Sequence, residues 1–238
     1  GAYQRIFAGG TGGTRTARDC GIYKLNEDGT KLLYMTFFGG SDNEQPHSLV
    51  VNHNNELVVY GSTESDDLPV KNGFQDKYGG EHDIFIAKFS SNGSQLLGST
   101  YIGDSGNDGL NGEYDDPGFS EFRNTDELVY NYGDLYRGEV IVDSFNNIFV
   151  ASTTESIRFP VSGSAFQNRY DGGEQDGVVM KLSPDCDTLV WSTFLGGSSH
   201  DAAYSLDFDK DFNLYVTGGT KSRNFPTLSN SYDDSYGG

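Results

Sequence analysis

The sequence predicts an all-β protein made of four-stranded antiparallel sheets, arranged as a segment of a β-propeller. Short apolar runs rich in Val, Ile, Phe, Tyr and Thr alternate with Gly, Asn, Asp and Pro, which is typical of strands joined by tight turns. The same series of runs returns after roughly sixty residues, as in repeat architectures. No long stretch places apolar residues at i, i+3, i+4 and i+7, so helices are not expected.

The clearest repeated element is a strand that contains a lysine. It occurs as DCGIYKL (19–25), DIFIAKF (83–89) and DGVVMKL (176–182), and a polar turn and a second strand follow each copy: LLYMTFFGG, LLGSTYIGD and LVWSTFLGG. In the middle copy, Ile84 and Ile86 point to one face of the strand while Phe85 and Ala87 point to the other. A strand that is apolar on both faces indicates a sheet covered on both sides by similar sheets. The lysines Lys24, Lys88 and Lys181 are interpreted as strand residues whose stems pack and whose amines reach carboxylates or solvent.

Two further strands complete each unit. A run into an Asn or Asp turn (HSLVVNHNNE, GEVIVDSFNN, AYSLDFDKDFN) precedes the strands at 57–63, 148–154 and 214–220, each of which ends in threonine. A large apolar residue then precedes proline at Leu68, Phe159 and Phe225. Four-stranded sheets stacked face to face around an axis form a β-propeller. Sandwiches and barrels remain alternatives, although they seldom repeat their side-chain pattern at this period.

These residues resemble the seven-bladed β-propeller repeat family, the SBBP-type repeats of bacterial secreted and cell-surface proteins. The shared motif is D-x-x-[IV]-x-K-[LF], S-T-[FY]-[LI]-G-G, V-D-x-x-x-N, Y-V-T-G-x-T, F-P and F-Q-x-x-Y-G-G. The unit at 176–238 keeps nearly all of it, whereas Met35 replaces the serine and Asn52 replaces the turn aspartate in earlier units. The resemblance covers almost the whole chain and implies a propeller fold within a long, multidomain, extracellular or cell-surface protein. It implies no particular ligand, because propellers serve many functions.

The phase of the repeat divides the chain within blades. Residues 1–40 are expected to form the outer strands of a first blade, 46–103 and 138–197 complete blades, 104–137 an insertion, and 203–238 the inner strands of a last blade. The two partial blades could combine and close a three-bladed ring. Because propellers usually have four to eight blades, we expect part of a larger ring instead, with the remaining blades of the same polypeptide as the first partner.

Composition limits the other partners. The formal net charge of −19 disfavours binding to nucleic acid and to anionic membranes, and no apolar stretch has the length of a membrane-spanning helix, so membrane insertion is not expected. The charge is interpreted mainly as a source of solubility. The two cysteines, Cys20 and Cys186, occupy non-equivalent positions of the repeat and are expected to be unpaired.

No catalytic motif is present, so the sequence predicts a protein that is not an enzyme, with no catalytic or metal-binding residues and no cofactor. Calcium is the one alternative: the segment 207–213 alternates oxygen donors but lacks the glycine and the glutamate of a helix–loop–helix calcium site. We expect ordinary Asx turns there and at the equivalent positions 52–56 and 143–147. His47 and His200 fall in comparable loops, but their spacing specifies no metal geometry.

The insertion at 104–137 is the candidate binding region. It is acidic and aromatic, and it lies on the face where propellers usually bind ligands. Tyrosines offer rigid contact area with a polar tip, and carboxylates could bind Ca²⁺ or a basic partner. The alternative is that the aromatic side chains pack the insertion onto its own blade as a cap. The candidate binding residues are Asp104, Asp108, Tyr114, Asp115, Asp116, Phe119, Tyr130, Tyr132 and Tyr136.

The function expected from these observations is a non-catalytic scaffold and interaction module. Two alternatives stay open: a glycan-binding or glycan-processing propeller whose insertion stacks aromatic rings on sugars, and a calcium-dependent adhesion module. The ligand is a protein or a glycan.

Overall fold

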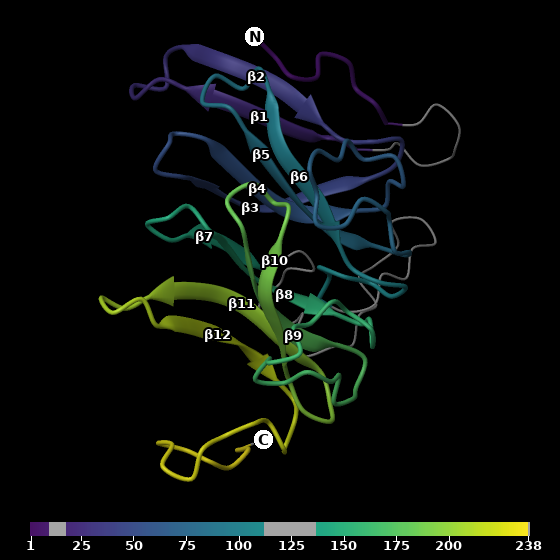
Figure 1. Ribbon diagram of the computed structural model, residues 1–238, viewed down its shortest axis with the longest axis vertical. Helices are drawn as coiled ribbons and strands as arrows, with labels where there is room; N and C mark the ends of the chain where they lie inside the picture. The colour runs from purple at the N-terminus through teal and green to yellow at the C-terminus, as the bar shows by residue number, and fades with distance from the viewer. Residues whose placement is uncertain (10–17, 112–136, 238) are drawn as a thin grey trace.

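The computed structural model describes residues 1–9, 18–111 and 137–237, and within these ranges it contains twelve strands and no helix. The strands form four antiparallel sheets that follow one another along the longest axis of the molecule (Figure 1). Two sheets have four strands, and the sheet at each end has two. The chain is therefore all-β and built of propeller-type blades, as the repeat predicts. Within the described ranges, no helix has the length and apolarity that crossing a membrane requires.

The first complete blade consists of β3 (Glu44–Val51), β4 (Leu57–Thr63), β5 (Asp83–Phe89) and β6 (Leu96–Ile102), hydrogen-bonded in that order. The second consists of β7 (Glu139–Val142), β8 (Ile148–Thr154), β9 (Asp176–Leu182) and β10 (Leu189–Leu195). Each strand pairs with its sequence neighbour, so every blade is a simple meander. The hydrogen-bonded order of the four strands in each sheet is the order in which the repeat places them along the chain.

The end sheets are β1 (Cys20–Leu25) with β2 (Leu32–Phe38), and β11 (Asp201–Phe208) with β12 (Leu214–Thr220). By sequence, β1 and β2 correspond to the third and fourth strands of a blade, and β11 and β12 to the first and second. Figure 1 shows the two pairs at opposite ends of the long axis. They do not combine into one mixed blade, so the structure does not show the three-bladed ring that the sequence left open.

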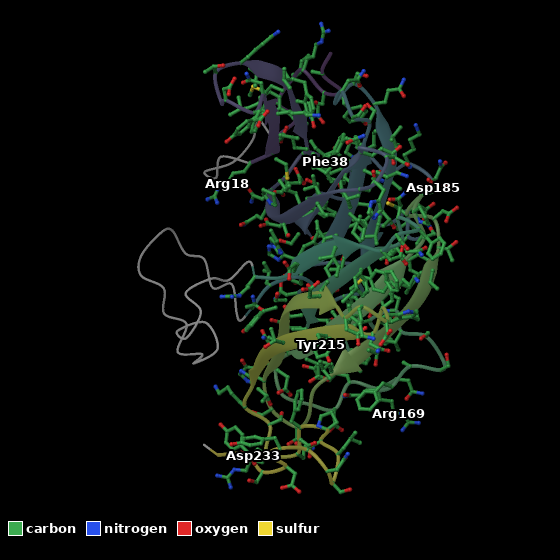
Figure 2. The ribbon with its side chains drawn as sticks, turned by 90° about the vertical axis from the view of Figure 1, so that its left-hand side faces the viewer. Arg18, Phe38, Arg169, Asp185, Tyr215 and Asp233 are labelled. Carbon is green, nitrogen blue, oxygen red and sulfur yellow. The ribbon has the colours of Figure 1, made fainter. Side chains whose placement is uncertain are left out.

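Burial between the sheets explains why the middle strands are apolar on both faces. Every residue of β4, β5 and β8 is buried. One face of β5 contributes Ile84 and Ile86 to a core cluster shared with the second blade, and the other contributes Phe85 and Phe89 to a cluster shared with β1 and β2. Phe38 of β2 packs against both of those phenylalanines and lies inside the stack (Figure 2). A third cluster joins the second blade to β11 and β12.

The turns between the first and second strands are Asx turns, as predicted. The Oδ1 atoms of Asn52, Asp143 and Asp209 each accept backbone N–H groups from residues two and four positions later. These bonds use the oxygens that a calcium loop would need, and they account for the alternating polar pattern at 207–213.

The repeated lysines are strand residues, also as predicted. Lys88 bonds Asp185 at 2.8 Å across to the second blade, and Lys181 bonds Asp143 at 3.3 Å with its amine 4.8 Å from the centre of the Phe149 ring. Cys20 and Cys186 are both buried and both free.

Candidate functional site

The predicted binding residues divide into two groups in the structure. Asp104 and Asp108 are described, and they lie beside the junction between the two complete blades. The other candidates lie outside the described residues: Tyr114, Asp115, Asp116, Phe119, Tyr130, Tyr132 and Tyr136. The described geometry therefore concerns the base of the insertion and the junctions on that edge of the blades.

Asp108 is a fully buried residue of the repeat and is not part of the insertion proper. It forms a bridge with Thr154, the last residue of β8, as Glu44 pairs with Thr63 in the preceding blade and Asp201 with Thr220 in the following one. Its carboxylate accepts hydrogen bonds from the Thr154 hydroxyl and from the Ser156 hydroxyl at 2.9 Å. Burial raises its pKa to about 8. Asp108 therefore holds the blade together and is not available to contact a ligand at the surface.

The insertion begins within the innermost strand of the second blade. The equivalent strands β3 and β11 have register irregularities between Pro46 and Ser48 and between Ala203 and Ser205. Residues 112–136, which lie outside the described ranges, fall at this same place in the chain, after the bridge at Asp108 and before Glu139 pairs with Ala151. The Asn111 side-chain amide donates to the Arg137 carbonyl at 3.1 Å, so the chain leaves and re-enters the strand at neighbouring points.

Asp104 lies at the edge of a groove between neighbouring blades. Its carboxylate pairs with the Arg158 guanidinium at 3.0 Å, and that arginine side chain is 77% exposed. The groove has a volume of about 460 Å³ and is lined by Phe74, Gln75, Asp76, Lys77, Tyr78, Gly79, Gly103, Asp104, Arg158 and Pro160. An exposed ion pair of this kind contributes little to stability, and both side chains are accessible from the groove.

The preceding junction has an equivalent groove of about 410 Å³. It is lined by Tyr3, Gln4, Ala8, Gly39, Gly40, Asp67 and Pro69, which occupy the same repeat positions as residues of the first groove. Asp67 stands where Arg158 stands, and its carboxylate accepts the Ser41 N–H at 2.6 Å. The grooves thus arise from the repeat, but they differ in charge, with an arginine and a lysine in only one of the two.

A belt of polar side chains crosses the same edge of the blades. The Asn43 amide bonds Glu64 at 3.1 Å, Glu64 bonds the His82 imidazole at 3.0 Å, and the other ring nitrogen of His82 lies 2.9 Å from the Asn107 amide oxygen. Asn107 continues the belt to Glu155 at 2.9 Å. Burial lowers the pKa of His82, but the hydrogen bond and charge of Glu64 outweigh it, so the pKa is raised overall.

The belt positions a histidine between a carboxylate and an amide, which is the arrangement that orients an imidazole in some catalytic sites. The hydrogen bonds of the described belt involve no Ser, Thr or Cys side chain beside His82 that would serve as a nucleophile. The two histidines singled out by sequence have separate surroundings. His47 is buried against Tyr60 with its pKa lowered to about 3 by burial and by His82, and His200 pairs with Glu174 at 3.3 Å.

Metal binding has no large ligand cluster to support it in the part of the chain that the structure describes. No group of three or more His, Cys, Asp or Glu side chains in those ranges has the geometry to hold a metal ion. Buried carboxylates are instead arranged in pairs, one pair at each junction between sheets.

Sequence reasoning missed the junction carboxylates Glu44 and Asp201, and it assigned the third, Asp108, to the insertion. A signal was present: each follows by five positions the first residue after the outermost strand, which is Gly39, Gly103 or Gly196. The segments GGSDNE, GDSGND and GGSSHD are therefore equivalent. Because the middle segment leads into the insertion, its aspartate was grouped with the insertion's acidic residues.

Comparisons with known proteins add no family to this description. The chain matches no model of a known protein family, and a search of curated proteins likewise found no match.

Proposed function

We propose that the chain is a non-catalytic β-propeller segment that serves as a scaffold and interaction module, with further blades of the same polypeptide as its first partner. The observation that carries this proposal is a pair of complementary open sheet edges, one at each end of the stack. Unpaired strand edges expose backbone N–H and C=O groups that bind an added strand readily.

The missing neighbours are defined by the repeat. In the complete blades the second strand pairs on both sides, as β4 does with β3 and β5, and β8 does with β7 and β9. The equivalent β12 pairs with β11 alone among the described strands, and β1, which is equivalent to β5 and β9, pairs with β2 alone. One edge therefore lacks a third strand and the other lacks a second strand.

The exposure of apolar side chains on the two end sheets also supports further blades as the partner. Tyr215 of β12 is 66% exposed, whereas its equivalents Val58 and Phe149 are 1% and 6% exposed inside complete blades. In β1 and β2, large apolar side chains are likewise exposed: Tyr23, Leu25, Leu32, Leu33 and Met35. An apolar face of this kind in an acidic protein is consistent with coverage by another blade.

The setting of the proposed scaffold follows from the resemblance to SBBP-type repeats, which implies a secreted or cell-surface bacterial protein. The glycan-binding and calcium-dependent alternatives stay predictions, because most of their candidate residues lie outside the described ranges. Proteins, glycans and Ca²⁺ remain to be screened as ligands of the insertion.

The proposal is tested with the 238-residue chain and a synthetic hairpin that carries its own third- and fourth-strand sequence, residues 19–39. We expect the hairpin to bind the chain at the free edge of β12, and the chain to associate head to tail as its concentration rises, as measured by light scattering. A hairpin with Ile22→Lys and Phe38→Lys is the matched control, because both side chains are buried where β1 and β2 pack on a blade. The proposal would be contradicted if the chain stayed a compact monomer at all concentrations and did not bind the hairpin.

A further inference from the structure

The junctions between sheets contain a repeated pair of acidic side chains. One member begins or precedes the third strand of a blade, and the other begins the first strand of the next blade. The three pairs are Asp19 with Glu44, Asp83 with Asp108, and Asp176 with Asp201. Asp83, Asp108, Asp176 and Asp201 are all 0% exposed.

The two carboxyl groups of a pair converge on one small space behind a glycine. A Cβ atom placed on Gly103 would lie 2.6 Å from Asp83 Oδ1 and 2.6 Å from Asp108 Oδ2. A Cβ atom placed on Gly196 would clash with Asp176 Oδ1 and would lie 3.0 Å from Asp201 Oδ2. A Cβ atom placed on Gly39 would clash with the carboxylates of Asp19 and Glu44. A side chain at this position would clash with the pair, which explains why all three junctions carry glycine.

Hydrogen-bond donors surround each pair but leave at least one oxygen without a donor. In the Asp83–Asp108 pair, Asp83 Oδ2 accepts from the Gly79 N–H at 2.9 Å and from the Gln75 amide at 3.3 Å, while Asp108 Oδ2 accepts from the Asp104 N–H and the Ser156 hydroxyl. Asp83 Oδ1 is buried and has no donor. Asp176 Oδ1 and Asp201 Oδ1 share that condition at the next junction. A buried oxygen without a partner is costly, so at least one hydrogen is missing at each site.

No cationic side chain neutralises these pairs among the described residues, where none of the six carboxylates forms an ion pair with Lys, Arg or His. Other titratable groups lie near the first pair. The charge of Asp104 disfavours ionisation of Asp83, and His82 favours it. Tyr78 and Tyr101 also lie near Asp83: burial raises the pKa of both phenols, and the charge of Asp83 adds to the rise. His82 is itself hydrogen-bonded to Glu64. Asp171 and Tyr170 lie near the second pair, and Cys20 and Tyr101 lie near Glu44.

We propose that the two carboxyl groups of each buried junction pair share one proton taken from solvent, so that the O–H of one residue donates a hydrogen bond to the carboxylate of the other. The proton supplies the missing hydrogen and reduces the charge of the pair from two to one. Two like charges in one buried site cannot both ionise easily, and the pair then titrates as a unit. Each bound proton thereby stabilises the contact between one blade and the next.

The electrostatics of the site agree with this arrangement. Burial raises the pKa of Asp83 to about 7 and that of Asp108 to about 8, and the charge of Asp83 adds to the rise at Asp108. Burial likewise raises the pKa of Asp176 to about 7, with Asp201 contributing, and raises that of Glu44 to about 7, with Asp19 contributing.

A shared proton fits these sites better than a bound Ca²⁺ does. Calcium takes six to eight oxygen ligands, and each junction supplies two carboxylates whose other oxygens already accept N–H and O–H groups. The described residues contain no cluster of three or more ligating side chains that would enlarge such a site.

The shared proton has a defined effect on stability. A carboxyl group whose pKa is raised by folding binds a proton in the folded chain that the unfolded chain has already released, over the range between the ordinary pKa near 4 and the folded pKa near 7 to 8. Stability is therefore greatest below this range and falls as pH rises through it.

The test compares the 238-residue chain with its variant Asp83→Asn/Asp176→Asn, in which an amide replaces the O–H donor without a charge. We expect the melting temperature of the unsubstituted chain to fall by roughly 5–10 °C between pH 5.5 and pH 8.5, and that of the variant to change much less. Asp66→Asn/Asp211→Asn is the charge-matched control, because both of those aspartates are exposed, and it should retain the full pH dependence.

Infrared spectroscopy provides a readout that a purely structural role would not change. At pH 6 the folded chain should show the carbonyl band of a protonated carboxylic acid, and the Asp83→Asn/Asp176→Asn variant should lack most of it. The proposal is overturned if that band is absent from the folded chain or unchanged in the variant. It is also overturned if Ca²⁺ at neutral pH stabilises the unsubstituted chain and not the variant, since the pairs would then be ionised cation ligands.

Discussion

Single residues of the repeat share a sequence position without sharing an environment. Lys24, Lys88 and Lys181 occupy the same place in their strands, yet Lys24 is exposed and Lys88 is 5% exposed. The Lys88 ammonium donates to the Pro184 carbonyl at 2.6 Å and to Asp185 at 2.8 Å, both in the turn after β9. Lys24 lies on the face of β1 that carries Cys20 and Ile22 and packs on the next blade, as Lys88 does on β5. The turn after β5, however, has Asn92 where the turn after β9 has Asp185.

Replacement of Lys88 by methionine is therefore expected to reduce the free energy of unfolding by about 1–2 kcal/mol. The loss is moderate because Asp185 is 72% exposed and stays hydrated once its partner is gone, while the buried stem of the side chain is retained in methionine. Lys24→Met is the matched control at the equivalent position and should change stability by less than about 0.5 kcal/mol. Urea unfolding measures both, and equal effects would show that the bonds of Lys88 to Pro184 and Asp185 do not stabilise the fold.

At the scale of the element, strand order and turn type could be predicted from sequence because they depend on local pattern. Apolar runs gave the strands, and Asn52, Asp143 and Asp209 gave turns whose side chains bond their own backbone. The junction carboxylates depend instead on residues far apart in the chain, such as Asp83 and Asp108, which meet only after two blades stack. No local pattern reveals that contact.

The base of the insertion was placed too early for the same reason. Sequence grouped residues 104–111 with the acidic segment, whereas Asp108 pairs with Thr154 and the Gly109 N–H bonds the Thr153 carbonyl, as in the regular blades. The Thr153 hydroxyl also donates to the Leu110 carbonyl at 2.7 Å. The blade therefore includes this stretch, and the insertion proper lies between Asn111 and Arg137.

Deletion of residues 112–136, with two glycines joining Asn111 to Arg137, is expected to leave the blade folded, because the hydrogen bond between these residues already brings the ends together. The free energy of unfolding should stay the same or rise by up to about 2 kcal/mol, since a shorter loop loses less entropy on closure. Deletion of 106–136 should instead destabilise the chain, because it also removes Asp108 and its bonds to Thr154 and Ser156. Unfolding of the shorter deletion would show that the insertion belongs to the core.

At the scale of the whole molecule, a large negative charge is spread over a thin stack of sheets. The chain has 35 acidic and 16 basic side chains, and an exposed pair such as Asp104 with Arg158 offsets little of the resulting repulsion. Repulsion of this kind acts between solvent-exposed groups and destabilises the compact state. The junction pairs are buried, so added salt screens them much less.

Raising NaCl from 10 mM to 500 mM at pH 7.5 is therefore expected to increase the melting temperature by several degrees, because the screening length falls from about 30 Å to below 10 Å. Choline chloride should act equally, since screening does not depend on which cation is present. The fall in stability between pH 5.5 and pH 8.5 should persist at high salt, because it originates in the buried junctions and not at the surface. A melting temperature that decreases with salt would mean that attractive surface pairs outweigh repulsion. If salt abolished the pH dependence, exposed carboxylates would be its source.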